Sequence, residues 1–138
     1  SRGNPGPSAI GVVICDEKGK TIKKYSEYLG ETTNNEAEYQ AVIFALKKIK
    51  ALYGKKKIEN LEIELKSDSE LLTRQLNGEY KILDKKIIDL FIKVWNLKID
   101  FGKVKFALIP RERNTEADRL VNETLDSQTR IKTLDLRF

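Results

Sequence analysis

The chain has 138 residues, 40% hydrophobic and 34% charged, which is enough for one compact domain with a core and too little for two. Its net charge of +5 permits a polyanionic partner, and the lack of histidine, with only one cysteine, excludes histidine general bases, histidine zinc sites and internal disulfides. No apolar run is long enough to cross a bilayer, and residues 1–5 contain no signal-peptide core. We therefore expect a single domain over residues 1–138, monomeric and cytoplasmic, without a membrane partner and with no protein partner that the sequence identifies.

The first elements read as an antiparallel hairpin followed by a helix. A β-branched run at residues 9–15 ends in a turn-like sequence, and residues 21–29 alternate as a partner strand does. Thr33 can cap the next helix, and Glu36 can reach back to the cap. Glu38 lies one turn before Ala41 and Val42, so it points towards the buried side. The alternative is that Glu38 only stabilises the positive end of the helix.

The middle of the chain alternates strand and helix. Residues 61–65 alternate like a strand, and Asp68 follows at its carboxyl end, where open α/β sheets place their ligand sites. The alternative role for Asp68 is that of a helix cap. A helix over residues 84–97 follows, and we expect its Trp95 to lie in the core.

The last third predicts one more strand and one more helix. The strand covers residues 104–109 and stops at Pro110, and the basic loop with Arg111 and Arg113 leads to Asn114, which can cap the helix. Residues 131–138 alternate again and predict a short extra strand or a disordered tail. The element order indicates an α/β fold with a mixed sheet.

Three carboxylates lie at the ends of elements, namely Glu38, Asp68 and Asp118. Clustered carboxylates repel one another unless a cation neutralises them, and oxygen ligands without histidine or thiolate suit Mg²⁺ or Mn²⁺. We expect the three to converge on a metal site that serves phosphoryl transfer.

The order and spacing of several motifs resemble type 1 ribonuclease H, in its compact archaeal-type branch. They are SRGNPGP at residues 1–7, TNNEAEY at 33–39, SDS at 67–69, QLNGEYK at 75–81, PRERN at 110–114 and ADRL at 117–120. The resemblance implies a mixed five-stranded sheet, an antiparallel hairpin and then parallel strands, flanked by helices. It also implies an endonuclease that hydrolyses the RNA strand of RNA/DNA hybrids with two metal ions, Mg²⁺ or Mn²⁺.

The resemblance assigns roles residue by residue. Glu38, Asp68 and Asp118 match three of the four catalytic, metal-binding carboxylates. The expected contacts to the nucleic acid are Gly3, Asn4, Thr33, Asn34, Asn35, Ser69, Lys81, Arg111, Arg113 and Asn114. A hybrid is recognised by groove shape and 2′-hydroxyls rather than base edges, which suits such polar and backbone contacts.

The chain departs from the family pattern at its start. The family's first strand and the catalytic Asp that ends it would precede Ser1. We favour a truncated sequence as the explanation. The alternatives are that residues 131–138 take the place of the missing strand, with Asp135 as a replacement carboxylate, or that the chain is a degenerate homologue. A non-catalytic hybrid-binding module is therefore the second functional hypothesis. A related nuclease acting on DNA junctions or transposon ends is disfavoured, because residues 33–35 match the hybrid-reading segment.

Overall fold

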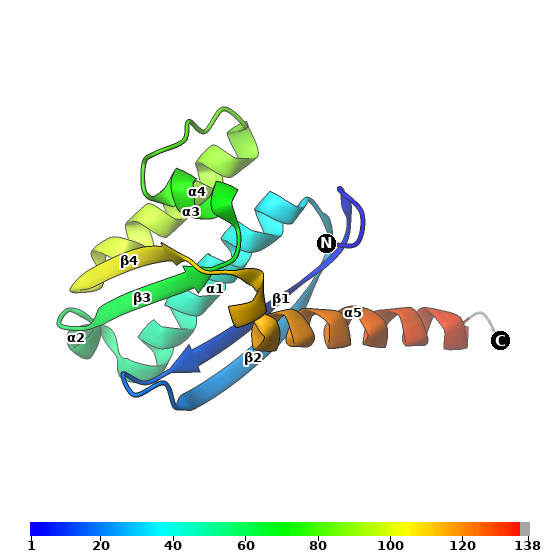
Figure 1. The fold of residues 1–138 in the computed structure, drawn as a ribbon, viewed down its shortest axis with the longest axis horizontal. Helices are drawn as coiled ribbons and strands as arrows, with labels where there is room; N and C mark the ends of the chain where they lie inside the picture. Colours follow the sequence, from blue (N-terminus) through cyan, green and yellow to red (C-terminus); the bar gives the residue numbers. More distant parts are fainter. Residues whose placement is uncertain (136–138) are drawn as a thin grey trace. The chain divides into compact units, whose positions relative to one another are not determined.

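The computed structural model describes residues 1–135 (Figure 1). The chain divides into two compact units. The first unit combines Ser1–Ala37 with the chain from Thr115 onwards, and the second comprises Glu38–Asn114. The strands are β1 (Gly6–Cys15), β2 (Thr21–Thr32), β3 (Glu62–Ser67) and β4 (Lys103–Leu108). The helices are α1 (Asn34–Tyr53), α2 (Lys55–Ile58), α3 (Glu70–Leu76), α4 (Lys85–Ile99), the 3₁₀ turn η1 (Arg111–Arg113) and α5 (Thr115–Asp135).

The first unit is a hairpin with a helix packed on it. β1 and β2 pair antiparallel, with Val12 opposite Tyr25, and the apolar side chains of β1 are buried. Helix α5 comes so close to β1 that a β-carbon built on Gly11 would clash with the carbonyl oxygen of Ala117. Glycine at position 11 therefore permits the helix to rest directly on the strand backbone.

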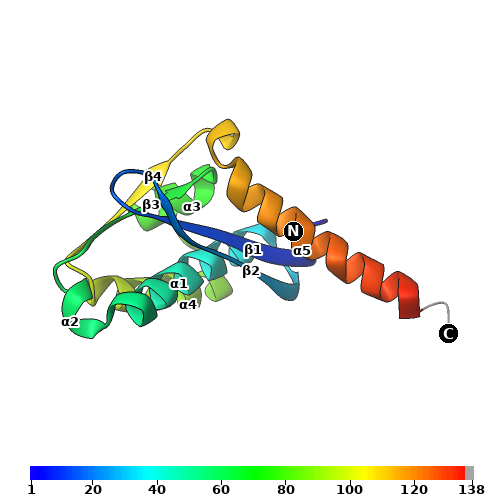
Figure 2. The same ribbon diagram turned by 90° about the horizontal axis from the view of Figure 1, so that it is seen from below.

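The second unit is built on a parallel strand pair. β3 and β4 run parallel, from Glu62 opposite Lys103 to Ser67 opposite Leu108, and α3 and α4 lie in the connection between them. A parallel pair needs such a crossover, because the chain must return to the starting edge of the sheet. In Figure 2, α1 and α4 lie on the same side of this pair. Leu46, Ile58 and Val94 are among its most deeply buried side chains.

Polar contacts fix the helices of the second unit. At the end of α3, the Asn77 side-chain amide donates a hydrogen bond of 3.1 Å to the carbonyl oxygen of Phe106 on β4. The Lys50 ammonium, in the last turn of α1, lies 2.8 Å from a carboxylate oxygen of Asp100, the residue that ends α4. The first contact attaches the end of α3 to β4, and the second attaches the end of α4 to α1.

The predicted α/β fold, with an antiparallel hairpin followed by parallel strands, is confirmed. The described strands pair as β1–β2 and β3–β4, so among them the five-stranded sheet that the resemblance implies is not formed. The extra strand predicted at residues 131–138 is wrong for residues 131–135, which continue α5 as far as Asp135. No glycine or proline interrupts the sequence from Thr115 to Asp135, so nothing in it ends the helix earlier. Residues 136–138 lie outside the described part of the chain.

The sequence predicted that Trp95 lies in the core. This prediction is wrong, because the Trp95 side chain is 52% exposed. The buried residues of α4 are Ile87, Leu90 and Val94, a stripe rotated away from Trp95. Among the described helices, none combines the length and the apolar character that spanning a bilayer requires.

Candidate active site

Glu38 is a half-buried acid near the start of the second unit. Burial raises the pKa of its carboxyl above the usual value of 4.5, and the negative charge of Asp68 raises it further. A hydrogen bond from the Ser69 hydroxyl and the positive charge of Arg111 act in the opposite direction. The structure thus brings Glu38 close to Asp68 and Ser69, although Glu38 precedes them by about 30 residues in sequence.

Asp68 owes its position to the parallel strand pair. It follows β3 directly, and Arg111 lies in η1 just beyond β4, so both residues stand at the carboxyl ends of adjacent parallel strands. The Arg111 guanidinium Nε lies 3.7 Å from Asp68 Oδ2, while the arginine side chain is 86% exposed. So exposed an ion pair is weak, and Arg111 can leave Asp68 at little cost.

Ser69 connects the local turn to Glu38. Its backbone N–H donates to Ser67 Oγ at 3.1 Å, and its own Oγ caps α3 by accepting from the Leu72 N–H at 3.2 Å. The same hydroxyl donates to the Glu38 carboxylate. Ser69, which the sequence predicted to contact nucleic acid, therefore also connects Glu38 on α1 to the start of α3.

Asp118 belongs to the first unit. It lies exposed in the first turn of α5, and the Asn122 side-chain amide donates to its Oδ2 at 3.4 Å. Within the part of the chain that the structure describes, no three His, Cys, Asp or Glu side chains are grouped as a metal site. Convergence of all three predicted acids therefore remains a prediction.

The donor chemistry of the second unit fits a hard cation. Glu38 and Asp68 supply carboxylate oxygens, and the negative charge of Asp68 disfavours the ionised form of Glu38, a cost that a bound cation removes. Oxygen donors of this kind suit Mg²⁺ or Mn²⁺. The pair can account for one such ion, and further ligands are needed for two.

Several predicted nucleic-acid contacts of the first unit lie side by side. Asn4 Oδ1 accepts a hydrogen bond of 2.9 Å from the Asn34 N–H, which joins the N-terminal loop to the start of α1. Gly3 in that loop has a φ of +90°, which favours glycine. Thr33 Oγ1 caps α1 at the Glu36 N–H, while the Glu36 carboxylate accepts from the Thr32 hydroxyl instead of reaching back to Thr33. Asn35 lies half-buried in the first turn of α1.

The other predicted contacts belong to the second unit. Lys81 is exposed in the segment between α3 and α4, and Arg113 is exposed in η1. Asn114 ends η1, with its N–H donating to the Arg111 carbonyl oxygen, and α5 begins at the next residue. Asp135, considered as a replacement carboxylate on an added strand, is the last described residue of α5.

Sequence reasoning missed one residue that supports this site. Tyr39, next to Glu38, is fully buried, and its hydroxyl bonds to Gln75 on α3. Burial raises the pKa of its phenol to about 12. A buried tyrosine needs a hydrogen-bond partner for its hydroxyl. In the sequence, the position of Tyr39 directly after the candidate acid Glu38 is the signal that could have indicated its supporting role.

The parallel pair, with Asp68 at its carboxyl end and Glu38 of α1 beside Asp68, defines an α/β protein with two neighbouring acids. The sequence model of the family described as "Reverse transcriptase-like" matches residues 1–124. Ribonuclease HI of Halobacterium salinarum is 36% identical over 126 residues, and a bifunctional protein of Mycobacterium tuberculosis is 32% identical over 136 residues. The chain spans 60% of the length of the first protein and 36% of the second.

Solved structures agree with these matches. LC11-RNase H1, isolated from compost by a metagenomic approach and solved in complex with an RNA/DNA hybrid, is 45% identical with a TM-score of 0.89; the alignment covers 94% of this chain and 93% of that one. RNase H1 of Halobacterium salinarum has a TM-score of 0.83 over 92% of each chain. The chain belongs to the ribonuclease H family of enzymes.

Proposed function

We propose that this chain is an endonuclease domain that hydrolyses the RNA strand of RNA/DNA hybrids. The observation that carries the proposal is the pairing of Glu38 with Asp68 at the carboxyl end of β3, in a chain similar to a protein solved with such a hybrid. Acids at this position, without histidine, suit phosphodiester hydrolysis that depends on divalent cations.

The proposed roles of the residues follow from their chemistry. Glu38 and Asp68, with Asp118 as the third acid, would hold Mg²⁺ or Mn²⁺. Bound there, two such ions would supply activation of an attacking water and stabilisation of the leaving oxygen. Ser69 and Tyr39 hold Glu38 in place through their hydrogen bonds. Arg111 would exchange its weak contact with Asp68 for a phosphate of the substrate.

Substrate selection would lie in the first unit. The Asn4–Asn34 hydrogen bond presents the N-terminal loop and the start of α1 as one polar surface. Side chains and backbone groups of this kind can contact 2′-hydroxyls and the minor groove, which distinguish a hybrid from a DNA duplex. Gly3, Asn4, Thr33, Asn34 and Asn35 are the residues that we propose for this recognition, with Lys81, Arg113 and Asn114 as contacts to the backbone.

Cleavage of an end-labelled hybrid by residues 1–138, with Mg²⁺ or Mn²⁺, tests the proposal. We expect residues 1–138 to bind the hybrid and to cleave its RNA strand slowly, and not to cleave a DNA duplex. Binding of the hybrid without cleavage would instead support the second candidate, a non-catalytic hybrid-binding module.

A second arm tests the contribution of a fourth acid. A family-like strand ending in Asp-Gly-Ala is added before Ser1, and we expect the cleavage rate to rise by several powers of ten. Each factor of ten requires only about 1.4 kcal/mol of transition-state stabilisation. If residues 1–138 already cleave at the rate of the extended chain, the fourth ligand lies within them, and Asp135→Asn tests the remaining acid that the sequence suggested.

A further inference from the structure

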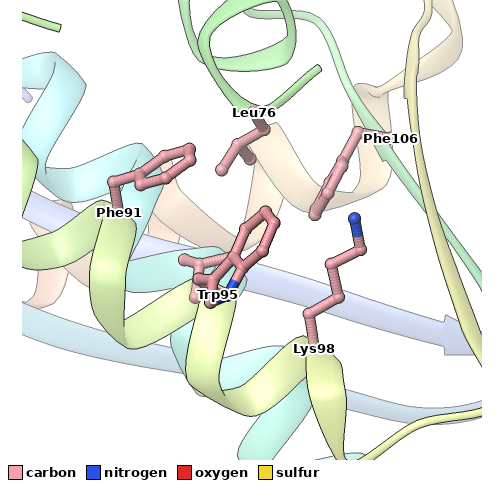
Figure 3. Close-up of a pocket in the computed structure, with 6 residues that line it drawn as sticks. Leu76, Phe91, Trp95, Lys98 and Phe106 are labelled. Atoms are coloured by element: carbon pink, nitrogen blue, oxygen red, sulfur yellow. The ribbon is translucent and has the colours of Figure 1, made fainter. Parts of the chain in front are cut away.

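Trp95 forms an exposed aromatic platform on α4. The side chain is 52% exposed, and Phe91, one turn earlier, stacks against it with ring centroids 6.3 Å apart. The Lys98 ammonium lies 5.5 Å from the Trp95 ring centroid and 5.8 Å from that of Phe106 on β4 (Figure 3). The indole is exposed, with Phe91 stacked against it and the Lys98 ammonium over its ring, so a base that stacks on the indole would displace the ammonium.

Two depressions flank this platform. The smaller one lies between Leu76, Phe91 and Phe106, with Trp95 and Lys98 along its side (Figure 3). The larger one has a volume of about 310 Å³ and extends from Trp95 and Lys98 past Ile99 to Lys103. Among the described residues that line either depression, the charged side chains are Lys98 and Lys103, and neither lining includes an acid.

The charge and shape of this surface favour one class of ligand. An aromatic face suits a nucleobase of any sequence, and lysines beside it suit the phosphates that follow the base. A volume of about 310 Å³ lies at the lower end of the range for small-ligand sites, which fits one nucleotide unit rather than a duplex. We propose that Trp95, Lys98 and Lys103 bind single-stranded nucleic acid, with a base stacked on the indole and phosphates at the two lysines.

A second copy of the chain is the competing occupant. Ile88, Ile92, Trp95 and Ile99 are all exposed and are spaced by four, three and four residues, a spacing typical of helix pairing. A stable interface, however, buries about 800 Å² on each partner, more than four partly exposed side chains of one helix supply. The concentration of lysine at the Trp95 end also favours a polyanion over another copy of a basic chain.

Trp95 is the only tryptophan of the chain, so its fluorescence reports directly on this site. The test titrates residues 1–138 with a short oligodeoxythymidine in buffer without divalent cations. We expect saturable quenching of the fluorescence that weakens as salt is added. Trp95→Leu should lower the affinity for the labelled oligonucleotide about tenfold, while Trp95→Phe should retain part of it, because a ring remains for stacking.

The lysines are tested by the salt dependence of binding. Lys98→Gln with Lys103→Gln should reduce the slope of log affinity against log salt by about 1.4, since each lost contact to a single-strand phosphate contributes about 0.7. The matched control is Lys18→Gln with Lys47→Gln, which removes the same charge from two exposed lysines outside the lining. An equal change in both double variants would overturn the proposal, as would the absence of quenching.

The outcome is separable from that of the proposed function. The site uses no candidate catalytic residue, so failure of hybrid cleavage leaves the expected quenching intact. A blue shift of the Trp95 fluorescence with rising protein concentration, without oligonucleotide, would assign the surface to self-association and contradict the proposal.

Discussion

The Tyr39 hydroxyl donates a hydrogen bond of 3.0 Å to Oε1 of Gln75, and both side chains are buried. Tyr39 adjoins Glu38 on α1, and Gln75 lies on α3, the helix that begins just after Asp68 and Ser69. This bond, together with the one from Ser69 to Glu38, therefore connects the helices on which the two neighbouring acids depend.

Tyr39→Phe removes the donor and leaves the Gln75 oxygen without this partner. We expect the free energy of unfolding to fall by about 1–2 kcal/mol, because a buried polar group loses a hydrogen bond. Denaturant unfolding at neutral pH measures the change. Tyr53→Phe, at the end of the same helix, is the control, and an equal loss in both variants would show that the Gln75 bond has no particular role.

The same residue predicts a pH dependence. The phenol has a pKa of about 12 in the folded chain against 10 in the unfolded chain, so its neutral form is the one that folding favours. Its contribution to stability is complete below pH 10 and is lost as the pH rises towards 12, on the order of 2 kcal/mol in total. Stability curves of the parent chain and Tyr39→Phe should therefore converge or cross above pH 10. A constant difference up to pH 12 would contradict the raised pKa.

Glu38→Gln should stabilise the fold at neutral pH while it removes activity. The raised pKa means that the ionised carboxylate costs stability, so its contribution is most favourable below pH 4.5 and is lost as the pH rises through the folded-state value. Glutamine carries no charge and avoids that loss. Thermal unfolding in EDTA should give a higher Tm for the variant at pH 7, and a smaller difference at pH 3.

Asp68→Asn serves as the companion variant, because it removes the neighbouring charge that raises the pKa of Glu38. It should stabilise the metal-free chain in the same direction. Added Mg²⁺ should raise the Tm of the parent chain more than that of either variant. A lower Tm for both variants at pH 7 would mean that the carboxylate pair is not a source of strain.

Loss of any proposed acid should reduce hybrid cleavage by several powers of ten. The variants are Glu38→Gln, Asp68→Asn and Asp118→Asn, assayed in the chain form that cleaves faster, with or without the added strand. Hybrid binding should persist, because the polar surface of the first unit is unchanged. Glu64→Gln, an exposed acid on β3, is the control. Unaltered cleavage by Asp118→Asn would remove that residue from the proposed site.

Asn34→Ala should reduce the preference for hybrid over DNA duplex. The residue lies at the junction of α1 with the N-terminal loop, where its N–H holds Asn4. We expect the affinity for hybrid to fall several-fold at fixed salt while the affinity for DNA duplex changes little, since 2′-hydroxyl and groove contacts provide the discrimination. Asn60→Ala, in the exposed turn before β3, is the control. An equal loss of affinity for hybrid and for DNA duplex would mean that the Asn34 side chain does not discriminate between the two duplexes.

Local patterns predicted the elements around the candidate site. Asp68 and Arg111 each follow a run with strand alternation, and parallel strands bring their carboxyl ends together, so their proximity follows from the element order. The bond from Ser69 to Glu38 does not, because it depends on how α1 packs near α3. Sequence spacing carries no information on that distance.

The errors have a common physical cause. The apolar residues of α4 occupy more than one face, so periodicity alone did not distinguish the buried stripe of Ile87, Leu90 and Val94 from the exposed side of Trp95. Likewise, the alternation in residues 131–138 is a short pattern, and the uninterrupted helix that begins at Thr115 continued through residues 131–135.

Gly11 has a consequence beyond the packing of the first unit. Its missing side chain lets β1 touch the backbone at Ala117, and Asp118 is the next residue of α5. A methyl group at position 11 would push that turn of the helix outward and carry the acid with it. A random mutagenesis screen for lost cleavage should therefore recover Gly11 alongside the carboxylates, even though it has no functional group of its own.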